Sequence, residues 1–321
     1  RALLSDAGLA SADAPLSARE LATQATYLAA SVFFILGLKS LTKADTARKG
    51  MQQAAIGMLL AIAGTLIVER IVEYQWIVGG LVLGTVIGWP LGTRVPMTAM
   101  PQRIAISHMF GALAAALVGI SEYTHLVGSA GTVPRVEMGA LGFEVLFGAL
   151  TVTGSFMAFG KLQEFLPGRP ITYAGQNLVN IGAMAAAVGL WIYLIVDPTQ
   201  QWAFWAMTAL AFVIGISFVL PIGGADMPVV VSLLNSYAGL AASATGFAIG
   251  NTVLIIAGAL DGASGFILSI IMSKAMNRSF TNVLFGAFGA APTASTKTSA
   301  GLVAKPISAE DAALQLAYAG R

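Results

Sequence analysis

The chain has 321 residues, of which 57% are hydrophobic and 10% are charged, and its formal net charge is +2 at pH 7. Soluble domains carry about 25% charged residues, so this composition excludes an ordinary soluble protein and predicts a membrane protein. Cysteine is absent and only two histidines occur, which excludes disulfides and thiolate metal sites. We expect no metal site and no nucleic-acid partner.

The first 21 residues predict a polar N-terminal tail. Charged side chains interrupt it, from Asp6 and Asp13 to Arg19 and Glu20. A cleavable secretory signal needs an apolar core of at least about 7 residues, and none precedes the first hydrophobic segment. We therefore predict a tail over residues 1–21 without a cleavable signal.

Nine long apolar segments follow the tail. A helix that crosses a bilayer needs about 20 predominantly apolar residues, and these segments lack the short alternating pattern of barrel strands. The predicted spans cover residues 22–41, 52–68, 75–93, 104–121, 138–158, 177–196, 202–220, 227–249 and 251–272. The predicted fold class is an all-α polytopic bundle of about nine transmembrane helices, with a transmembrane domain over residues 22–289.

Basic residues concentrate on one side of these spans, and cytoplasmic loops are enriched in Lys and Arg. The basic side carries Lys43, Arg48, Lys49, Arg94, Arg103, Lys161, Arg169, Lys274 and Arg278. The opposite side carries Glu69, Arg70, Glu73, Glu122, His125, Arg135, Glu137 and Asp197. We predict that the N-terminus lies outside and the C-terminus lies in the cytoplasm or the mitochondrial matrix.

The last 32 residues, 290–321, differ in character from the spans. Residues 290–306 are small and polar and include proline, which is typical of a linker. Ser308 is predicted to cap a helix whose first turn contains Glu310 and Asp311, and we expect a soluble domain to continue beyond Arg321. The sequence contains no glycine-rich nucleotide-binding loop after a strand pattern.

Four polar residues inside the predicted spans are candidates for function. A carboxylate at mid-membrane costs about 3 kcal/mol, so Asp261 indicates a proton relay or ion ligand, unless it is a protonated carboxyl in a packed interface. Glu144 has the same two interpretations, or it reaches the membrane surface. His108 can carry a proton near neutral pH or simply bond to a backbone carbonyl, and Asn235 can hold two helices together.

Glycine spacing predicts close helix contacts. Gly84, Gly88 and Gly92 share one helix face, and so do Gly258 and Gly262. Small residues at this spacing let two transmembrane helices approach closely, so we interpret both sets as packing surfaces.

Five runs of sequence carry a resemblance to a known family. They are YLAASVFFILGLKSLTKADTARKG at 27–50, TGSFMAFGKLQ at 153–163, GGADMPVVVSLLNSYAG at 223–239, GALDGASGFILS at 258–269 and KAMNRSF at 274–280. Over about residues 25–321 the chain closely resembles the membrane domain of the β subunit of proton-translocating nicotinamide nucleotide (NAD(P)) transhydrogenase.

The resemblance implies an enzyme complex that couples proton movement across the membrane to hydride transfer between NADH and NADP+. It implies that a domain beyond Arg321 binds NADP(H), that residues 308–321 begin this domain, and that a partner α subunit binds NAD(H). This chain alone is then expected to bind neither nucleotide and not to catalyse hydride transfer. The resemblance also implies membrane helices from the α subunit, a dimer of protomers, and a bacterial inner membrane rather than a mitochondrial one.

Site residues follow from the same resemblance. The implied proton pathway contains His108, Asn235, Ser236 and Ser264. Asp261 stands where the family has an apolar residue; it is either an added relay carboxyl or a variant packing contact, and we include it in the predicted pathway.

Two further groups of residues match the family. Asp226 and Arg278 match positions at the face that meets the NADP(H) domain, so we predict that they take part in domain coupling. Gly258, Gly262 and Gly265 match the packing face of the last helix.

The intramembrane residues also allow a rival function. A secondary transporter or ion channel could use Asp261, Asn235 and His108 as a solute site, and would transport solute without nucleotides. A purely structural membrane anchor is a third possibility.

Overall fold

A computed structural model describes residues 17–67, 74–277, 279–280 and 307–318 of the chain. The chain divides into two units, residues 1–289 and 290–321. In the second unit, α11 (Ala309–Tyr318) follows Ser308, whose hydroxyl oxygen accepts a hydrogen bond from the Asp311 amide at 3.1 Å. The helices α1 to α9 belong to the first unit.

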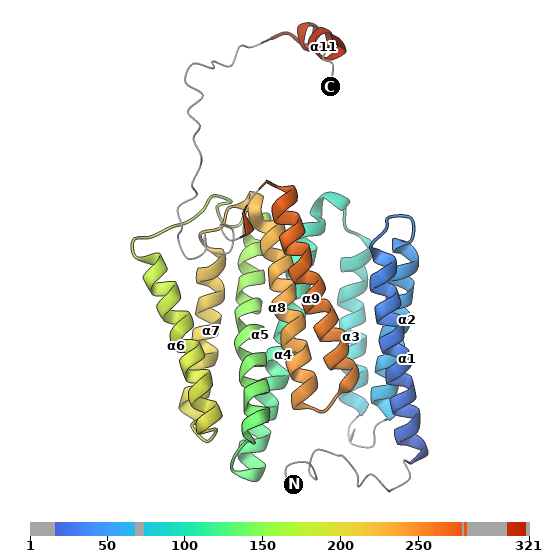
Figure 1. The fold of residues 1–321 in the computed structure, drawn as a ribbon, viewed down its shortest axis with the longest axis vertical. Coiled ribbons are helices and arrows are strands. Elements are labelled where there is room, and N and C mark those ends of the chain that lie inside the picture. The colour runs from blue at the N-terminus through green and yellow to red at the C-terminus, as the bar shows by residue number, and fades with distance from the viewer. Residues whose placement is uncertain (1–16, 68–73, 278, 281–306, 319–321) are drawn as a thin grey trace. The chain divides into compact units, whose positions relative to one another are not determined.

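Nine helices of the described residues are long and apolar enough to cross a membrane, and Figure 1 shows them side by side. They are α1 (Ala18–Leu41), α2 (Ala47–Ile67), α3 (Tyr74–Thr93), α4 (Met100–Ala130), α5 (Arg135–Leu162), α6 (Gln176–Val196), α7 (Gln201–Val219), α8 (Met227–Ala248) and α9 (Thr252–Ala275). The described part of the chain contains no strand. The prediction of an all-α polytopic membrane protein is confirmed.

Local sequence explains where several helices begin and end. Ser17 and Glu20 form a capping box at the start of α1, and Asn251 accepts a hydrogen bond from the Leu254 amide at the start of α9. Both arrangements satisfy amides that have no partner within a helix. Gly131 ends α4 with a φ of 73°, a left-handed conformation that glycine adopts without strain.

The largest difference from the sequence prediction is the connection between α4 and α5. The predicted spans ended at residue 121 and began again at residue 138, but the helices continue to Ala130 and begin at Arg135. Glu122 and His125 therefore lie on α4 rather than in a loop. Hydropathy marks only the apolar part of a helix, whereas the helix itself continues until Gly131 breaks it.

Four connections lie at one end of the bundle, at the top of Figure 1. They comprise residues 42–46, 94–99, 163–175 and 220–226, and the predicted basic side of the spans lies there. We call it the basic end.

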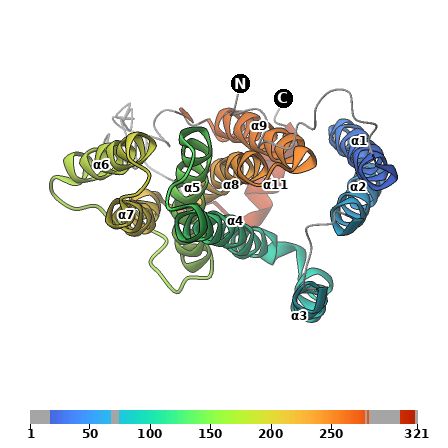
Figure 2. The same cartoon turned by 90° about the horizontal axis from the view of Figure 1, so that it is seen from below.

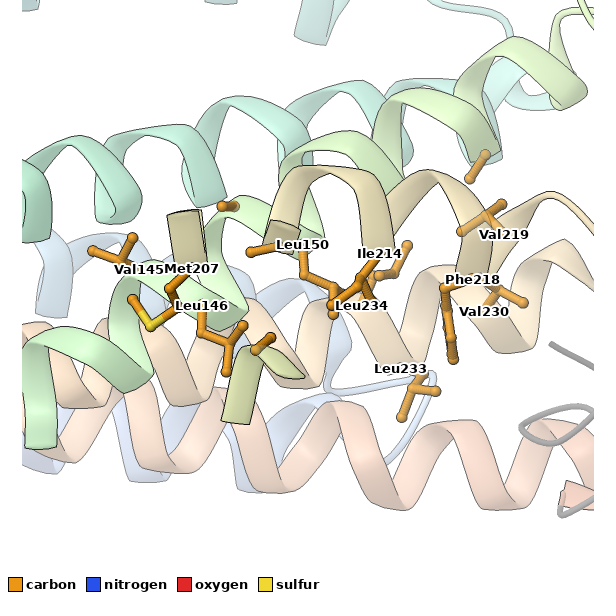
Figure 3. Packing of buried hydrophobic residues seen from close by; sticks show 14 of the residues in the cluster. Val145, Leu146, Leu150, Met207, Ile214, Phe218, Val219, Val230, Leu233 and Leu234 are labelled. Atoms are coloured by element: carbon orange, nitrogen blue, oxygen red, sulfur yellow. The ribbon is translucent and has the colours of Figure 1, made fainter. Parts of the chain in front are cut away.

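Helix α5 lies at the centre of the first unit, with 61% of its most apolar 18-residue window buried, and it packs against α4, α6, α7 and α8 (Figure 2). Leu146 and Leu150 of α5 meet Met207 and Ile214 of α7 and Leu234 of α8 in the apolar core (Figure 3). This core fixes α8 against α5 and so positions the polar residues that α8 carries.

Helix α3 differs from the others because it buries no residue. A side chain added at Gly84, Gly88 or Gly92 would meet nothing within 4 Å. The predicted close contact at this glycine stripe is therefore not made with any described part of the chain.

Helices α8 and α9 pack most closely, through glycine and serine. A Cβ at Gly262 would lie 3.1 Å from the Leu240 amide nitrogen, and one at Gly265 would lie 2.8 Å from the Ser236 amide nitrogen. Three α8 hydroxyls donate to α9 carbonyls across this contact: Ser232 to Gly265 at 3.0 Å, Ser236 to Gly262 at 2.7 Å and Ser243 to Ile255 at 3.1 Å. Small residues thus bring the helices close enough for side chains of α8 to donate hydrogen bonds directly to the backbone of α9.

We predict that Gly258→Ala destabilises the bundle, because the added methyl group would lie 2.7 Å from the Gly239 carbonyl oxygen and even closer to the Ser243 amide nitrogen. Overpacking of this kind costs about 1–3 kcal/mol, so the thermal unfolding temperature of the detergent-solubilised chain should fall by several degrees. Gly182→Ala on α6 is the matched control, since nothing lies within 4 Å of its Cβ position. Equal unfolding temperatures for the two variants would contradict the close contact.

Candidate proton site and coupling face

A polar pair connects α8 and α9 within the bundle. The Asn235 Nδ2 group donates to Asp261 Oδ1 at 3.3 Å. Asn235 lies eight residues past the start of α8, about 12 Å along the helix axis from the basic end. The pairing exists because the glycine and serine contact holds α8 and α9 in this register.

His108 of α4 lies within electrostatic range of one member of this pair, Asp261. It lies eight residues past Met100, which is again about 12 Å along the axis from the basic end. His108 and Asp261 are close enough for their charges to interact. Three elements thus bring an imidazole, an amide and a carboxyl group together, and we call His108, Asn235 and Asp261 the polar cluster.

The two serines of the predicted pathway lie beside the cluster but form other bonds. Ser236 is buried and donates to the Gly262 carbonyl, so its hydroxyl holds α8 to α9. Ser264 donates to the Asp261 backbone carbonyl at 2.9 Å, within its own helix.

Asp261 is an exposed residue on the surface of this chain. A charged side chain at this depth costs about 3 kcal/mol when it faces lipid. Water or another protein helix is therefore the favourable neighbour for this face.

A short turn joins α7 to α8 at the basic end. It contains a 3₁₀ helix, η3 (Gly224–Asp226), directly before Met227. The Gly224 amide donates to the Gly168 carbonyl at 2.7 Å, and the Ile171 amide donates to the Leu220 carbonyl at 3.1 Å. Two connections, residues 163–175 and 220–226, are thus bonded together around Asp226.

The second residue of the predicted coupling face, Arg278, lies outside the described residues. Its role stays a prediction from the sequence.

Lys161 is a residue of this face whose contacts the sequence did not reveal. It lies near the end of α5 with 2% of its surface exposed, and its Nζ group donates to the carbonyls of Val219 at 3.2 Å, Leu220 at 2.5 Å and Ile222 at 2.7 Å. The ammonium group has three donors, so all of them are used at the end of α7. A positive charge at a helix C-terminus is also favourable to the helix dipole.

In the sequence, Lys161 was only one of the basic residues that predict which end of the spans faces the cytoplasm. The three carbonyl groups that it binds are 58 to 61 residues further along the chain. The sequence signal for these contacts was a lysine placed just before the end of a mostly apolar helix.

We predict that Lys161→Met lowers the stability of the bundle by about 3 kcal/mol, because three buried carbonyl groups lose a charged donor. Thermal unfolding of the detergent-solubilised chain measures this loss. Lys274→Met, at an exposed lysine at the end of α9, should leave the unfolding temperature nearly unchanged. An equal effect of both substitutions would contradict a specific role of the Lys161 contacts.

Comparison with known proteins matches the sequence of this chain to one family. Residues 23–321 match the family model described as NAD(P) transhydrogenase beta subunit. Two relatives named NAD(P) transhydrogenase subunit beta, from Rhodospirillum rubrum and from a named strain of that species, are each 41% identical over 271 residues. The alignment covers 83% of this chain and 58% of each relative, so the chain spans little more than half the length of these proteins.

Proposed function

Because the chain belongs to the NAD(P) transhydrogenase beta subunit family, we propose that it forms the proton-translocating membrane part of an NAD(P) transhydrogenase. Proton movement through the bundle is coupled to hydride transfer between NADH and NADP+ in the whole complex. The observation that carries this proposal is the polar cluster, where the charges of His108 and Asp261 interact at the depth of the membrane-spanning helices.

The nucleotides bind to other parts of the complex. A domain that continues from α11 binds NADP(H), and an α subunit binds NAD(H), so the nucleotides meet outside the membrane. Membrane helices of the α subunit cover the exposed face of Asp261, because that face is costly against lipid. The complex is a dimer of such protomers in a bacterial inner membrane, with the basic end in the cytoplasm.

The polar cluster can hold a proton in more than one place. Imidazole titrates near neutral pH, and the Asp261 carboxyl group can pass a proton to it or accept one from it. A change in charge alters the attraction between His108 and Asp261, which lie on different helices. Protonation therefore favours one arrangement of α4 and α9 over another.

Helix α8 connects this change to the basic end. Asn235 lies about two turns past the start of α8, which directly follows Asp226. Lys161 binds carbonyls at the end of α7 and in the turn before α8. A shift at Asn235 consequently moves the turn that contains Asp226. Coupling requires that the NADP(H) domain bind its nucleotide differently in the two states.

We predict that His108→Ala in the intact complex lowers proton pumping by about 100-fold, the typical contribution of a positioned proton-transfer group. Pumping is measured in proteoliposomes during hydride transfer between added nucleotides. His125→Ala is the matched control, since His125 is the other histidine of the chain and lies on the same helix, beyond the polar cluster.

Normal proton pumping by the His108→Ala complex would refute this role. Nucleotide-independent uptake of a solute by liposomes that contain the chain alone would instead support a secondary transporter or ion channel.

A further inference from the structure

Glu144 is a carboxyl group in the core of the bundle that the polar cluster does not use. It lies nine residues into α5, about 14 Å along the axis from the end opposite the basic end. None of its surface is exposed. Neither carboxyl oxygen has a hydrogen-bond partner within the described part of the chain.

Its surroundings do not suit a charge. A Cβ at Gly119 of α4 would lie 2.9 Å from the Glu144 carboxyl carbon, so glycine provides the space that this group fills. The nearest charged group that acts on it is another acid, Glu122 of α4, and α8 carries no charged residue. An unpaired charge in such a site costs several kcal/mol, so this packing accommodates the neutral acid.

A neighbouring hydroxyl group suits both forms of the acid. Thr245 of α8 is close enough to interact with the carboxyl group, and its own proton is donated to the Ala241 carbonyl at 3.0 Å. The Thr245 oxygen can therefore accept a hydrogen bond from the neutral acid, while the Thr245 side chain and the Gly119 backbone lie close enough to interact with the carboxylate as well.

A line of polar groups continues from Glu144 toward the basic end. Thr151 and Ser155 follow it at seven and eleven residues, which places them on the same face of α5, and both are buried. The Thr151 hydroxyl has no hydrogen-bond partner among the described residues. This face packs on α4, because a Cβ at Gly148 would lie 3.2 Å from the Ala116 Cβ atom.

The corresponding face of α4 contains His108. Gly119, Ala112 and His108 are spaced by seven and four residues, so they share one face. Glu144 meets this face at Gly119, which is 11 residues and about 16 Å from His108 along the axis. The interface of α4 and α5 therefore runs from Glu144 to the depth of the polar cluster.

We infer that Glu144 binds the transported proton in the half of the bundle opposite the basic end, and passes it along the interface of α4 and α5 to the polar cluster. This inference rests on the proposed function. The cluster lies about 12 Å from the basic end, whereas the hydrocarbon layer is about 30 Å thick, so a second proton-binding group is needed in the other half. Of the buried residues that the structure describes, the only other one with a carboxyl or amine side chain is Lys161, whose three donors are engaged.

The proton step is simple. The Glu144 carboxylate binds a proton that arrives from the aqueous phase at its end of the bundle, and becomes the neutral acid that this packing accommodates. Its O–H bond then breaks as the proton passes toward His108, with Thr151, Ser155 and water between α4 and α5 as carriers, and the carboxylate is restored.

The test uses the intact complex with Glu144→Gln, which keeps the size and hydrogen-bonding capacity of the side chain but cannot release a proton. We expect proton pumping in proteoliposomes to fall by about 100-fold. In the unaltered complex, the infrared difference spectrum recorded on addition of NADPH should contain the carbonyl band of a protonated carboxylic acid. This band should be absent from the spectrum of the Glu144→Gln complex. Glu137→Gln, seven residues earlier on α5, is the control and should leave pumping and the band unchanged.

A shorter acid separates proton binding from packing. Glu144→Asp keeps the exchangeable proton but leaves a cavity, so it should restore part of the pumping that Glu144→Gln removes. Equal pumping by the Gln and Asp variants, whether normal or impaired, would overturn the inference, and so would an infrared band that persists in Glu144→Gln. If the unaltered complex pumps no protons, the proposed function itself is wrong.

Discussion

The contact between α8 and α9 is the interaction on which the polar cluster depends. Glycines on α9 bring the helices close enough for Ser232, Ser236 and Ser243 to donate directly to backbone carbonyls. In lipid there is no water to replace such bonds, so they fix the register of the pair. Asn235 can reach Asp261 because of this register.

The same helix connects the membrane interior to the basic end. Helix α8 begins at the turn that contains Asp226 and reaches Asn235 two turns later. Lys161 binds carbonyls at the end of α7 and in that turn, and the core of α5, α7 and α8 keeps these elements together. The structure therefore contains a continuous helix between the polar cluster and the face proposed to meet the NADP(H) domain.

The sequence predicted those features that follow from local composition. Nine apolar segments were sufficient to predict the nine membrane-length helices of the described residues. Polar residues within these segments were sufficient to select His108, Asn235, Asp261 and Glu144 as candidates for function. The sequence could not predict contacts between distant segments. Lys161 meets the carbonyls that it binds, and Glu144 meets Gly119, only in the folded bundle. The end of α4 was predicted wrongly because hydropathy declines at residue 121, before Gly131 ends the helix.

The most direct test of the central claim is the number of protons that the intact complex takes up or releases when it binds NADPH. Titration calorimetry in buffers of different protonation enthalpy measures this number, and linkage requires it to differ from zero if nucleotide binding shifts the charge of the polar cluster. We expect a measurable exchange with the unaltered chain and a clearly smaller one with Asp261→Asn. The same proton exchange in both complexes would contradict a role for the polar cluster in coupling.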